Sequence, residues 1–271
     1  MYQTRATNNL RTVKAEFGSP MSFLETIRRK FFAITPEYRR FVRPFPKFHE
    51  LRQSLKTSGT VVGFYTRNSF YADEAKRMEK SARRLGLTVE TTAMDGAGSW
   101  VKNAALKPTF LLEAREAHKG PLLYVDVDAV FHKDPWPKLD AIDADIGVFY
   151  SREGNLISAT IFLADTPEVL ELLRQWKNAC DSQPEIWDQV TLQEILSNIS
   201  DKRLSIARLP VSFCWVFDRF KNGFSDEVFI EQLQASRQAT SKRRLFGRRS
   251  KRLVRRDERI KEIEHILAED P

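Results

Sequence analysis

The sequence has few of the residues that mark disulfide-rich and zinc-binding proteins. Its 271 residues include two cysteines, Cys180 and Cys214, and four histidines. Two cysteines cannot build a disulfide framework or a CxxC zinc site, and a reducing compartment is therefore expected. The histidines are scattered and lack the spacing of a metal site. These counts exclude a disulfide-stabilised scaffold and a cysteine-based zinc module.

Long apolar runs and two nucleotide-binding fingerprints are also absent from the sequence. No run approaches the roughly 20 residues of a membrane-spanning helix, and residues 1–10 lack the apolar core of a signal peptide. Neither a GxGxxG motif nor a P-loop signature follows the first expected strand, residues 60–66. We therefore expect a cytoplasmic protein without a dinucleotide-binding fingerprint or a P-loop.

The net charge of +8 is unevenly distributed along the chain. Residues 1–59 carry 12 basic and 4 acidic side chains, residues 60–236 carry 20 and 26, and residues 237–271 carry 12 and 6. An acidic core thus lies between two basic arms, and the arms are expected to meet an anionic partner of their own. This pattern predicts a globular domain over 60–237 and a basic C-terminal tail over 238–271.

The two arms carry different local patterns. Aromatic and basic side chains interleave over residues 21–48, where Ser22 and Glu25 fit a capping box and predict a helix to about Ala33. We favour packing of this arm on the core, although an anionic surface at the inner face of a membrane would use the same side chains. Nucleic acid is not expected as a partner. The C-terminal tail is expected to end in a short helix from Glu258 to Ala268.

Short apolar runs alternate with amphipathic helical patterns through the central region. This order predicts βαβ units, and therefore an α/β fold in which helices flank a parallel sheet. The expected strands are 60–66, 87–91, 122–131, 145–151, 156–164 and 205–209, and the expected helices are 71–85, 100–118, 167–180 and one that opens at 187–189.

The run from Leu122 to Phe131 carries the strongest chemical signal. Four apolar or aromatic residues lead into Asp126-Val127-Asp128, and the run resembles a fully buried strand. Strand alternation would place Asp126 and Asp128 on one face, at the carboxyl end where α/β sheets bind ligands. Two neighbouring carboxylates need a cation or a shared proton, and a divalent ion carrying a phosphate ligand is one solution.

Several spaced stretches form a set that covers roughly residues 60–237: Phe64-Tyr65-Thr66, Gly98 to Asn103, Lys107-Pro108, Tyr124 to Asp128, Leu156 to Phe162, Trp187-Asp188-Gln189, Leu209-Pro210, Phe213 to Asp218 and Gln234 to Arg237. Together they resemble GT-A glycosyltransferases of the nucleotide-diphospho-sugar transferase superfamily, and most closely bacterial and phage-encoded members with a DxD motif. The resemblance implies a single catalytic domain with a GT-A (Rossmann-like), mostly parallel mixed sheet flanked by helices.

The resemblance implies metal-dependent transfer of a sugar from a nucleotide-diphosphate sugar to a glycan, lipid or protein acceptor. Asp128 would bind Mn²⁺ or Mg²⁺ directly, and Asp126 would contact the metal or the donor ribose. Similar proteins tend to carry a third ligand, a histidine, where this chain has Gln232. An amide oxygen is a weaker ligand for manganese than an imidazole, so the metal affinity of this site depends on Gln232.

Further residues are expected to bind the donor. Lys107 would meet phosphate or the donor sugar as a point charge, with a solvated helix lysine as the alternative. Tyr65 and Thr66 end the first strand, where they would contact base and phosphate, unless the tyrosine is packed in the core. Ser158 and Thr160 form the polar face of their strand, which lines the donor pocket or faces solvent.

Asp188 and Gln189 are the candidates for the sugar or acceptor side. An aspartate before an apolar helical run is also an ordinary helix N-cap, and that reading remains open for Asp188.

Two other functions compete with glycosyl transfer. Asp126-Val127-Asp128-Ala129-Val130 also fits the nucleophile motif of haloacid-dehalogenase-like phosphatases, in which Asp126 would be phosphorylated. The second alternative is a non-catalytic scaffold with the GT-A-like fold, whose arms bind a membrane or nucleic acid. It is supported by Gln232 and by Ala159, which stands where similar proteins tend to have glycine.

Overall fold

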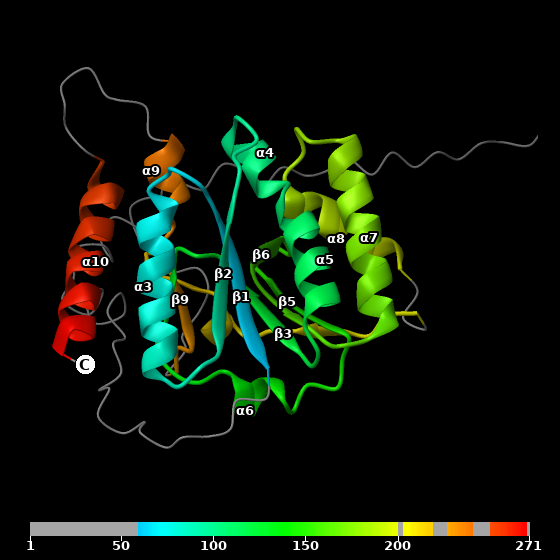
Figure 1. The fold of residues 1–271 in the computed structure, drawn as a ribbon, viewed down its shortest axis with the longest axis horizontal. Helices are drawn as coiled ribbons and strands as arrows, with labels where there is room; N and C mark the ends of the chain where they lie inside the picture. The colour runs from blue at the N-terminus through cyan, green and yellow to red at the C-terminus, as the bar shows by residue number, and fades with distance from the viewer. Residues whose placement is uncertain (1–58, 200–202, 219–226, 241–249, 270–271) are drawn as a thin grey trace, which may run out of the picture. The chain divides into compact units, whose positions relative to one another are not determined.

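The computed structural model describes residues 59–199, 203–218, 227–240 and 250–269 (Figure 1). All of the described residues belong to one compact unit, Val42–Pro271. The helix predicted from Ser22 to Ala33 lies outside the described residues.

The main sheet contains six strands in the order β2-β1-β3-β6-β5-β7. β1 pairs in parallel with β2 and β3, and β5 pairs in parallel with β7, whereas β6 runs antiparallel to both of its neighbours. The predicted mostly parallel mixed sheet is therefore confirmed. Its strands are β1 (Thr60–Thr66), β2 (Val89–Met94), β3 (Leu122–Val125), β5 (Ile146–Tyr150), β6 (Leu156–Leu163) and β7 (Ile206–Arg208).

Helices cover both faces of this sheet. α3 packs on one face, while α5, α7 and α8 cover the other (Figure 1). Among the helices of the described ranges, none is both long and apolar enough to cross a membrane. The helices are α3 (Tyr71–Arg84), α4 (Trp100–Ala104), α5 (Lys107–Ala117), α6 (Trp136–Leu139), α7 (Pro167–Ser182), α8 (Asp188–Asn198), α9 (Ser236–Thr240) and α10 (Lys251–Glu269), with a 3₁₀ turn at Val211–Phe213.

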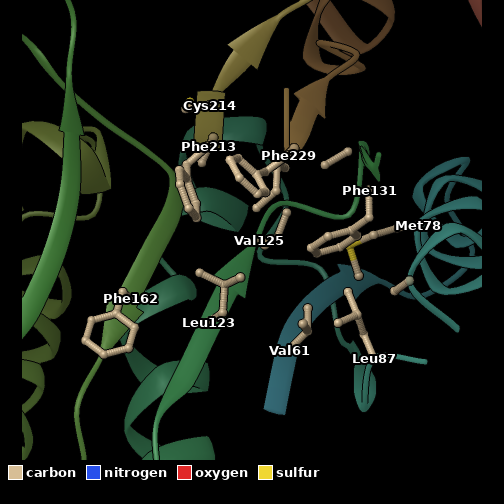
Figure 2. Close-up of a cluster of buried hydrophobic side chains, with 14 of the residues drawn as sticks. Val61, Met78, Leu87, Leu123, Val125, Phe131, Phe162, Phe213, Cys214 and Phe229 are labelled. Carbon is tan, nitrogen blue, oxygen red and sulfur yellow. The ribbon is translucent and has the colours of Figure 1, made fainter. Parts of the chain in front are cut away.

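The pleat of the central strands explains why their sequences are continuously apolar. Leu123 and Val125 pack with Met78 of α3 in one buried cluster, which Figure 2 shows. Their neighbours Leu122 and Tyr124 point into a second cluster, on the side of α5 and α7. Because both faces are buried, no polar alternation can appear in the strand.

A second sheet corrects the prediction of a single strand over Leu122–Phe131. β3 ends at Val125, and β4 (Ala129–Phe131) joins a separate sheet in the order β4-β9-β8, with β8 at Trp215–Val216 and β9 at Ile230–Gln232. Asp126 and Asp128 lie in the turn between the sheets. The Asp126 amide still bonds to the carbonyl of Ala159 on β6, at 2.9 Å, before the chain leaves the main sheet. The two aspartates therefore do not occupy alternate positions of one strand.

Two helical predictions are corrected by the structure. The helix expected over 100–118 is two helices, because Pro108 is accommodated only in a first turn and α5 begins one residue before it. The last helix, α10, begins at Lys251 and not at Glu258. The N-terminus of α7 is capped by the Thr166 side chain, which accepts a hydrogen bond from the amide of Val169 at 3.4 Å.

Candidate functional site

A cavity of about 310 Å³ opens at the carboxyl ends of β1 and β3. This is the edge at which open α/β sheets bind ligands. Its lining includes Phe64, Tyr65, Thr66, Tyr71, Trp100, Asn103, Lys107, Tyr124, Asp126, Asp128, Ser158, Ala159, Trp187, Asp188, Gln189, Gln234 and Ser236. Most of the predicted site residues thus meet around one space, although they come from five separate parts of the chain.

Lys107 joins the two sides of this cavity. It is the first residue of α5, and its ammonium lies 3.2 Å from Oδ1 of Asp126 and 3.1 Å from Oδ2 of Asp188. The same ammonium donates to the hydroxyl and the carbonyl of Ser158, at 2.9 and 3.0 Å. A lysine with these contacts is fully engaged, since an ammonium has three N–H donors.

The charge of Lys107 is maintained by its partners. Its side chain is only 5% exposed, and burial alone would lower the pKa, but the carboxylates of Asp126 and Asp188 outweigh burial and raise the pKa above its usual value. The ammonium therefore stays charged at neutral pH. This geometry rules out the alternative of a solvated helix lysine.

Asp188 is held in the cavity by contacts away from its own helix. Trp187 occupies the N-cap position of α8, and the Asp188 carboxylate accepts a hydrogen bond from the Ser158 hydroxyl at 2.7 Å. The Asp188 carbonyl accepts from the buried indole of Trp176 at 3.0 Å. The N-cap reading of Asp188 is therefore wrong. Its neighbour Gln189 lines the same cavity.

Asp126 has a second partner that sequence reasoning missed. The hydroxyl of Tyr124 donates to Oδ1 of Asp126 at 2.7 Å, and the Lys107 ammonium lies 5.0 Å from the centre of the tyrosine ring. Burial, together with the negative charge of Asp126, raises the pKa of Tyr124 well above its usual value. Tyr124 therefore remains protonated and can act as a permanent donor. Its position one residue before the end of β3 and two residues before Asp126 was the available signal.

Asp128 is buried and is held by backbone groups. Its carboxylate accepts from the amide of Ala235, and its carbonyl accepts from the amide of Leu233 at 2.8 Å. Burial raises the pKa of Asp128 to about 7, with a further contribution from Asp126, while the Ala235 amide works in the opposite direction. Burial thus disfavours the charged form of Asp128, and Arg256 offsets this effect only in part. A divalent cation would favour the charged form, and two neighbouring carboxylates are oxygen donors that fit such an ion.

Two predicted residues are not brought to the cavity. Gln232 on β9 is buried, and its amide nitrogen donates to the Ala159 carbonyl at 3.3 Å and to the Thr160 hydroxyl at 3.2 Å. Thr160 in turn donates to the carbonyl of Phe213 at 2.8 Å. Neither side chain lines the cavity, and neither faces solvent. Within the part of the chain that the structure describes, no group of three or more histidine, cysteine, aspartate or glutamate side chains is placed to hold a metal ion.

The rim of the cavity is aromatic and has no counterpart among the predicted site residues. Trp100 and Trp187 meet edge to face, with ring centres 5.5 Å apart, and Trp187 is 48% exposed. Asn103 and Gln234 also line the cavity, and Gln234 adopts a left-handed backbone conformation with φ of 57°. Tyr71 completes this side. Trp100, Asn103, Trp187 and Gln234 belong to motifs that the resemblance identifies, whereas no signal in the sequence marks Tyr71.

Comparisons with known proteins give the family. A sequence profile described as nucleotide-diphospho-sugar transferase matches residues 96–243, which is more than half of the chain. The matched region contains the Lys107, Asp126–Asp128, Ser158 and Asp188 positions described above. A search of curated proteins finds no match.

Solved structures with similar folds are glycosyltransferases. One, involved in glycosylation of the major capsid of PBCV-1, is 12% identical, with a TM-score of 0.53 over 76% of this chain and 98% of its own. GlyE of Streptococcus pneumoniae TIGR4 is 14% identical (TM-score 0.49), and the match spans 79% of this chain and 63% of GlyE. The galactosyltransferase LgtC, in complex with donor and acceptor sugar analogs, is 12% identical (TM-score 0.44), with coverage of 64% and 86%.

The capsid-glycosylating enzyme supports the same fold at a sequence identity too low to carry function. Fold and family agree with each other and with the position of the cavity at the sheet edge. The chain therefore belongs to the nucleotide-diphospho-sugar transferase family and has the fold of GT-A glycosyltransferases.

Proposed function

We propose that this protein transfers a sugar from a nucleotide-diphosphate sugar to an acceptor in a metal-dependent reaction. The observation that supports this most is the pairing of Lys107 with both Asp126 and Asp188 beside Asp128, a carboxyl group whose pKa burial raises to about 7. A divalent cation held by Asp126 and Asp128 would neutralise the departing nucleotide diphosphate. Gln232 could join them only after its amide left Thr160.

Lys107 has a positioning role in this proposal. Its N–H groups are directed to Ser158, Asp126 and Asp188, so it fixes both carboxylates before any substrate arrives. Preorganised charges of this kind avoid reorganisation during the reaction. The same positive charge would attract a donor phosphate that enters the cavity.

The remaining side chains of the cavity are assigned to two groups, one that binds the donor nucleotide and one that binds the transferred sugar or the acceptor. Tyr65 and Thr66, at the end of β1, would contact the donor base and phosphate. Both contacts of the Asp188 carboxylate use Oδ2, and we assign its Oδ1 to a sugar hydroxyl. Gln189 follows Asp188 into the cavity and would bind the transferred sugar or the acceptor.

A saccharide acceptor fits the rim of the cavity. Trp187 exposes 48% of its surface and Val190, three residues along α8, exposes 42%. A pyranose has an apolar face that packs on an indole, and its hydroxyl groups suit planar amides such as those of Asn103 and Gln189. We propose that the acceptor sugar stacks on Trp187, whose ring Trp100 holds from the side.

The test is a screen of UDP- and GDP-sugars for hydrolysis with Mn²⁺ or Mg²⁺. Wild type should release nucleotide from one donor, and Asp128→Asn should lose this activity. Asp143→Asn, at an exposed position outside the cavity, serves as the matched control. Wild-type activity that persists in a chelator, or that survives Asp128→Asn, would contradict the proposal.

The two alternatives differ in their support. Family membership counts against the haloacid-dehalogenase-like phosphatase, whose support is limited to the motif from Asp126 to Val130. The non-catalytic scaffold keeps one, because Gln232 bonds to Thr160 and stays out of the cavity. If no nucleotide sugar raises the melting temperature, with or without metal, the scaffold becomes the better description.

The expected binding of the basic arms to an anionic membrane surface stays a prediction. Residues 1–58 and 241–249, which hold most of the basic side chains in question, lie outside the described residues.

A further inference from the structure

The C-terminal helix reaches the candidate site through a buried arginine. α10 begins at Lys251, beyond the residues that the family profile matches. A basic stretch of this kind is usually solvated, yet Arg256 is only 2% exposed and its guanidinium is directed into the protein. Such a buried charge needs specific partners.

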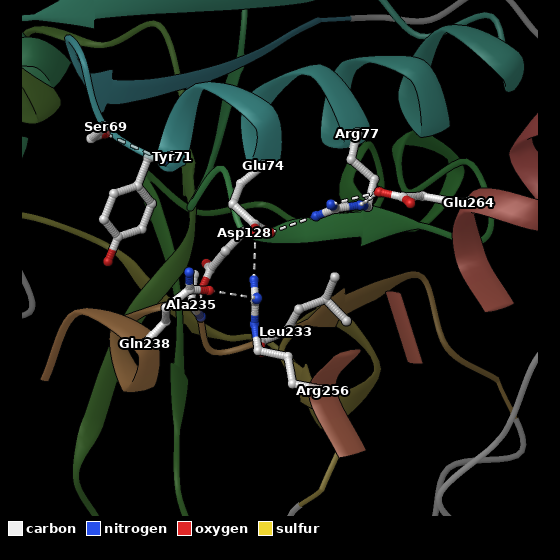
Figure 3. A network of polar contacts seen from close by, with 10 residues as sticks. All are labelled: Ser69, Tyr71, Glu74, Arg77, Asp128, Leu233, Ala235, Gln238, Arg256 and Glu264. Atoms are coloured by element: carbon white, nitrogen blue, oxygen red, sulfur yellow. Dashed lines mark hydrogen bonds and ion pairs between the residues drawn. The ribbon is translucent and has the colours of Figure 1, made fainter. Parts of the chain in front are cut away.

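The partners of Arg256 belong to the elements around Asp128 (Figure 3). Its Nε donates to the carbonyl of Leu233 at 2.9 Å, and its Nη2 pairs with Glu74 of α3 at 2.6 Å. The amides of Leu233 and Ala235 are the groups that hold the carbonyl and the carboxylate of Asp128. The Arg256 guanidinium therefore anchors the 233–235 turn, and two amides of this turn bind Asp128.

That turn has an unfavourable backbone conformation at its centre. Gln234 has φ of 57°, in the left-handed region that is rare outside glycine, asparagine and aspartate. Conformations of this kind persist only where the surroundings impose them. Leu233, on one side, is held by Arg256 and Asp128, and Ala235, on the other, by Asp128. The result places Gln234 in the lining of the cavity.

A second arginine fixes α10 in the same place. Arg259 binds both carboxylate oxygens of Glu231 on β9, at 2.9 and 2.8 Å, and Glu231 also contacts the ring of His132 at 2.9 Å. Ile263 and Leu267 add an apolar contact in a cluster with Val130, Phe217 and Leu233. The helix is therefore docked through buried groups along more than two turns.

We propose that α10 is part of the donor site and that Arg256 is a positioning residue, which fixes the 233–235 turn and through it the carboxylate of Asp128. This inference rests on the metal-binding role proposed for Asp128. It adds a part of the chain that lies outside the family match. It also gives the buried Arg256 a purpose beyond stability.

The test compares Arg256→Met with Arg77→Met in the full chain. Arg77 is the matched control because it pairs with the same Glu74 at 2.6 Å and with Glu264 of α10 at 2.8 Å, but has no contact with the turn. The first measurement is amide hydrogen exchange of Leu233 and Ala235, read by NMR without metal. The second is the affinity for Mn²⁺ alone, followed by titration calorimetry.

Arg256→Met should accelerate exchange of these two amides by about tenfold or more relative to Val61 of β1, because the turn then opens locally. It should weaken Mn²⁺ binding by about tenfold, the usual effect of losing a group that orients a ligand. Arg77→Met should lower the melting temperature and leave both quantities within about threefold of wild type. Equal effects of the two variants, or unchanged exchange in Arg256→Met, would overturn the proposal.

Arg256→Lys provides the second variant if Arg256→Met does not fold. A lysine keeps the charge beside Glu74 but lacks the planar fork that also reaches Leu233, so exchange at Leu233 should still increase. Unchanged exchange in Arg256→Lys would count against the proposal. A wild type that binds no Mn²⁺ would remove the proposed metal role of Asp128, whereas the exchange data would still decide whether Arg256 positions the turn.

Discussion

The two aspartates of the Asp126–Asp128 turn are held in opposite ways. Asp126 faces the Lys107 ammonium at 3.2 Å and the Tyr124 hydroxyl at 2.7 Å, so its charge is balanced inside the protein. Asp128 is held by the amide of Ala235, and its pKa is raised to about 7 by burial and by Asp126. One carboxylate is paired with a built-in cation, whereas the other is fixed in position but disfavoured in its charged form by burial, which Arg256 offsets only in part.

This difference shows how one turn can serve two purposes. The Asp126 half of the turn, which is Asp126 with its partners Lys107 and Tyr124, needs no external ion. It also gives rigidity to the side of the cavity where Asp188 lies. The Asp128 half is Asp128 with the 233–235 turn that holds it. The charged form of this carboxylate is favoured when a cation binds, because a fixed carboxylate with an incompletely compensated charge has a higher affinity for an external ion.

The largest effect is expected from Lys107→Met. Removing one partner of a buried ion pair costs about 3–5 kcal/mol, and here the Asp188 carboxylate is left buried and uncompensated, whereas the Asp126 side chain, which is 34% exposed, adds little. Urea unfolding should show this loss in free energy of unfolding. Lys102→Met, which breaks an exposed pair with Glu185 at 3.0 Å, should cost less than about 1 kcal/mol. A loss below that value in Lys107→Met would mean that the Asp126 half is not held by its lysine.

Acid should weaken the contact between Glu231 and α10, and with it the support of the 233–235 turn that holds Asp128. Burial alone would raise the pKa of Glu231, but Arg259 and His132 lower it from 4.5 to about 2. Glu231 therefore contributes stability that is present above pH 4.5 and is lost as the pH falls towards about 2, by about 3 kcal/mol in total. Unfolding curves between pH 7 and pH 2 should show this loss, and Glu231→Gln should flatten it. An equally steep curve in Glu231→Gln would place the acid sensitivity elsewhere.

Charge removal at the two aspartates should change stability in opposite directions. In metal-free protein at pH 8, Asp128→Asn should raise the free energy of unfolding by on the order of 2 kcal/mol, since part of the desolvation cost disappears with the charge. Asp126→Asn should lower it, because Lys107 loses one of its two carboxylates. Thermal unfolding with Asp143→Asn as control measures both. A change of the same sign in the two variants would remove the distinction between the halves.

The sequence predicted those parts of the site that follow from the runs of apolar residues in single strands. Apolar runs identify β1, β3 and β6, and the residues at their ends, such as Ser158, do line the cavity. The division of Leu122–Phe131 could not be predicted, because the residues before and after Asp126–Asp128 are equally apolar. What separates β3 from β4 is pairing with distant partners, Ala129 with Gln232 in one sheet and Val125 with Thr160 in the other.

The C-terminal helix shows the same limit for charge patterns. In sequence, Arg256 and Arg259 are two more basic residues in a basic tail, and composition predicted an arm that meets an anionic partner of its own. Their burial depends on Glu74 and Glu231, carboxylates far away along the chain that the fold brings to one place. Composition cannot identify such pairs, since it contains no information on which opposite charges meet.

The smallest effect on stability, and a control for both halves, is expected from Trp187→Ala. Because Trp187 is half-exposed at the rim, its loss should change stability and Mn²⁺ affinity little. Transfer to a saccharide acceptor found by screening should instead lose between about three- and tenfold in kcat/KM, the range of one aromatic stacking contact. Trp187→Phe should recover most of this loss. If hydrolysis of the donor by water falls as much as transfer does, Trp187 acts on the donor and the acceptor does not stack there. If only transfer falls, the rim works independently of Asp126 and Asp128. Neither the Lys107 ammonium nor a bound divalent cation then contributes to binding of the acceptor at the rim.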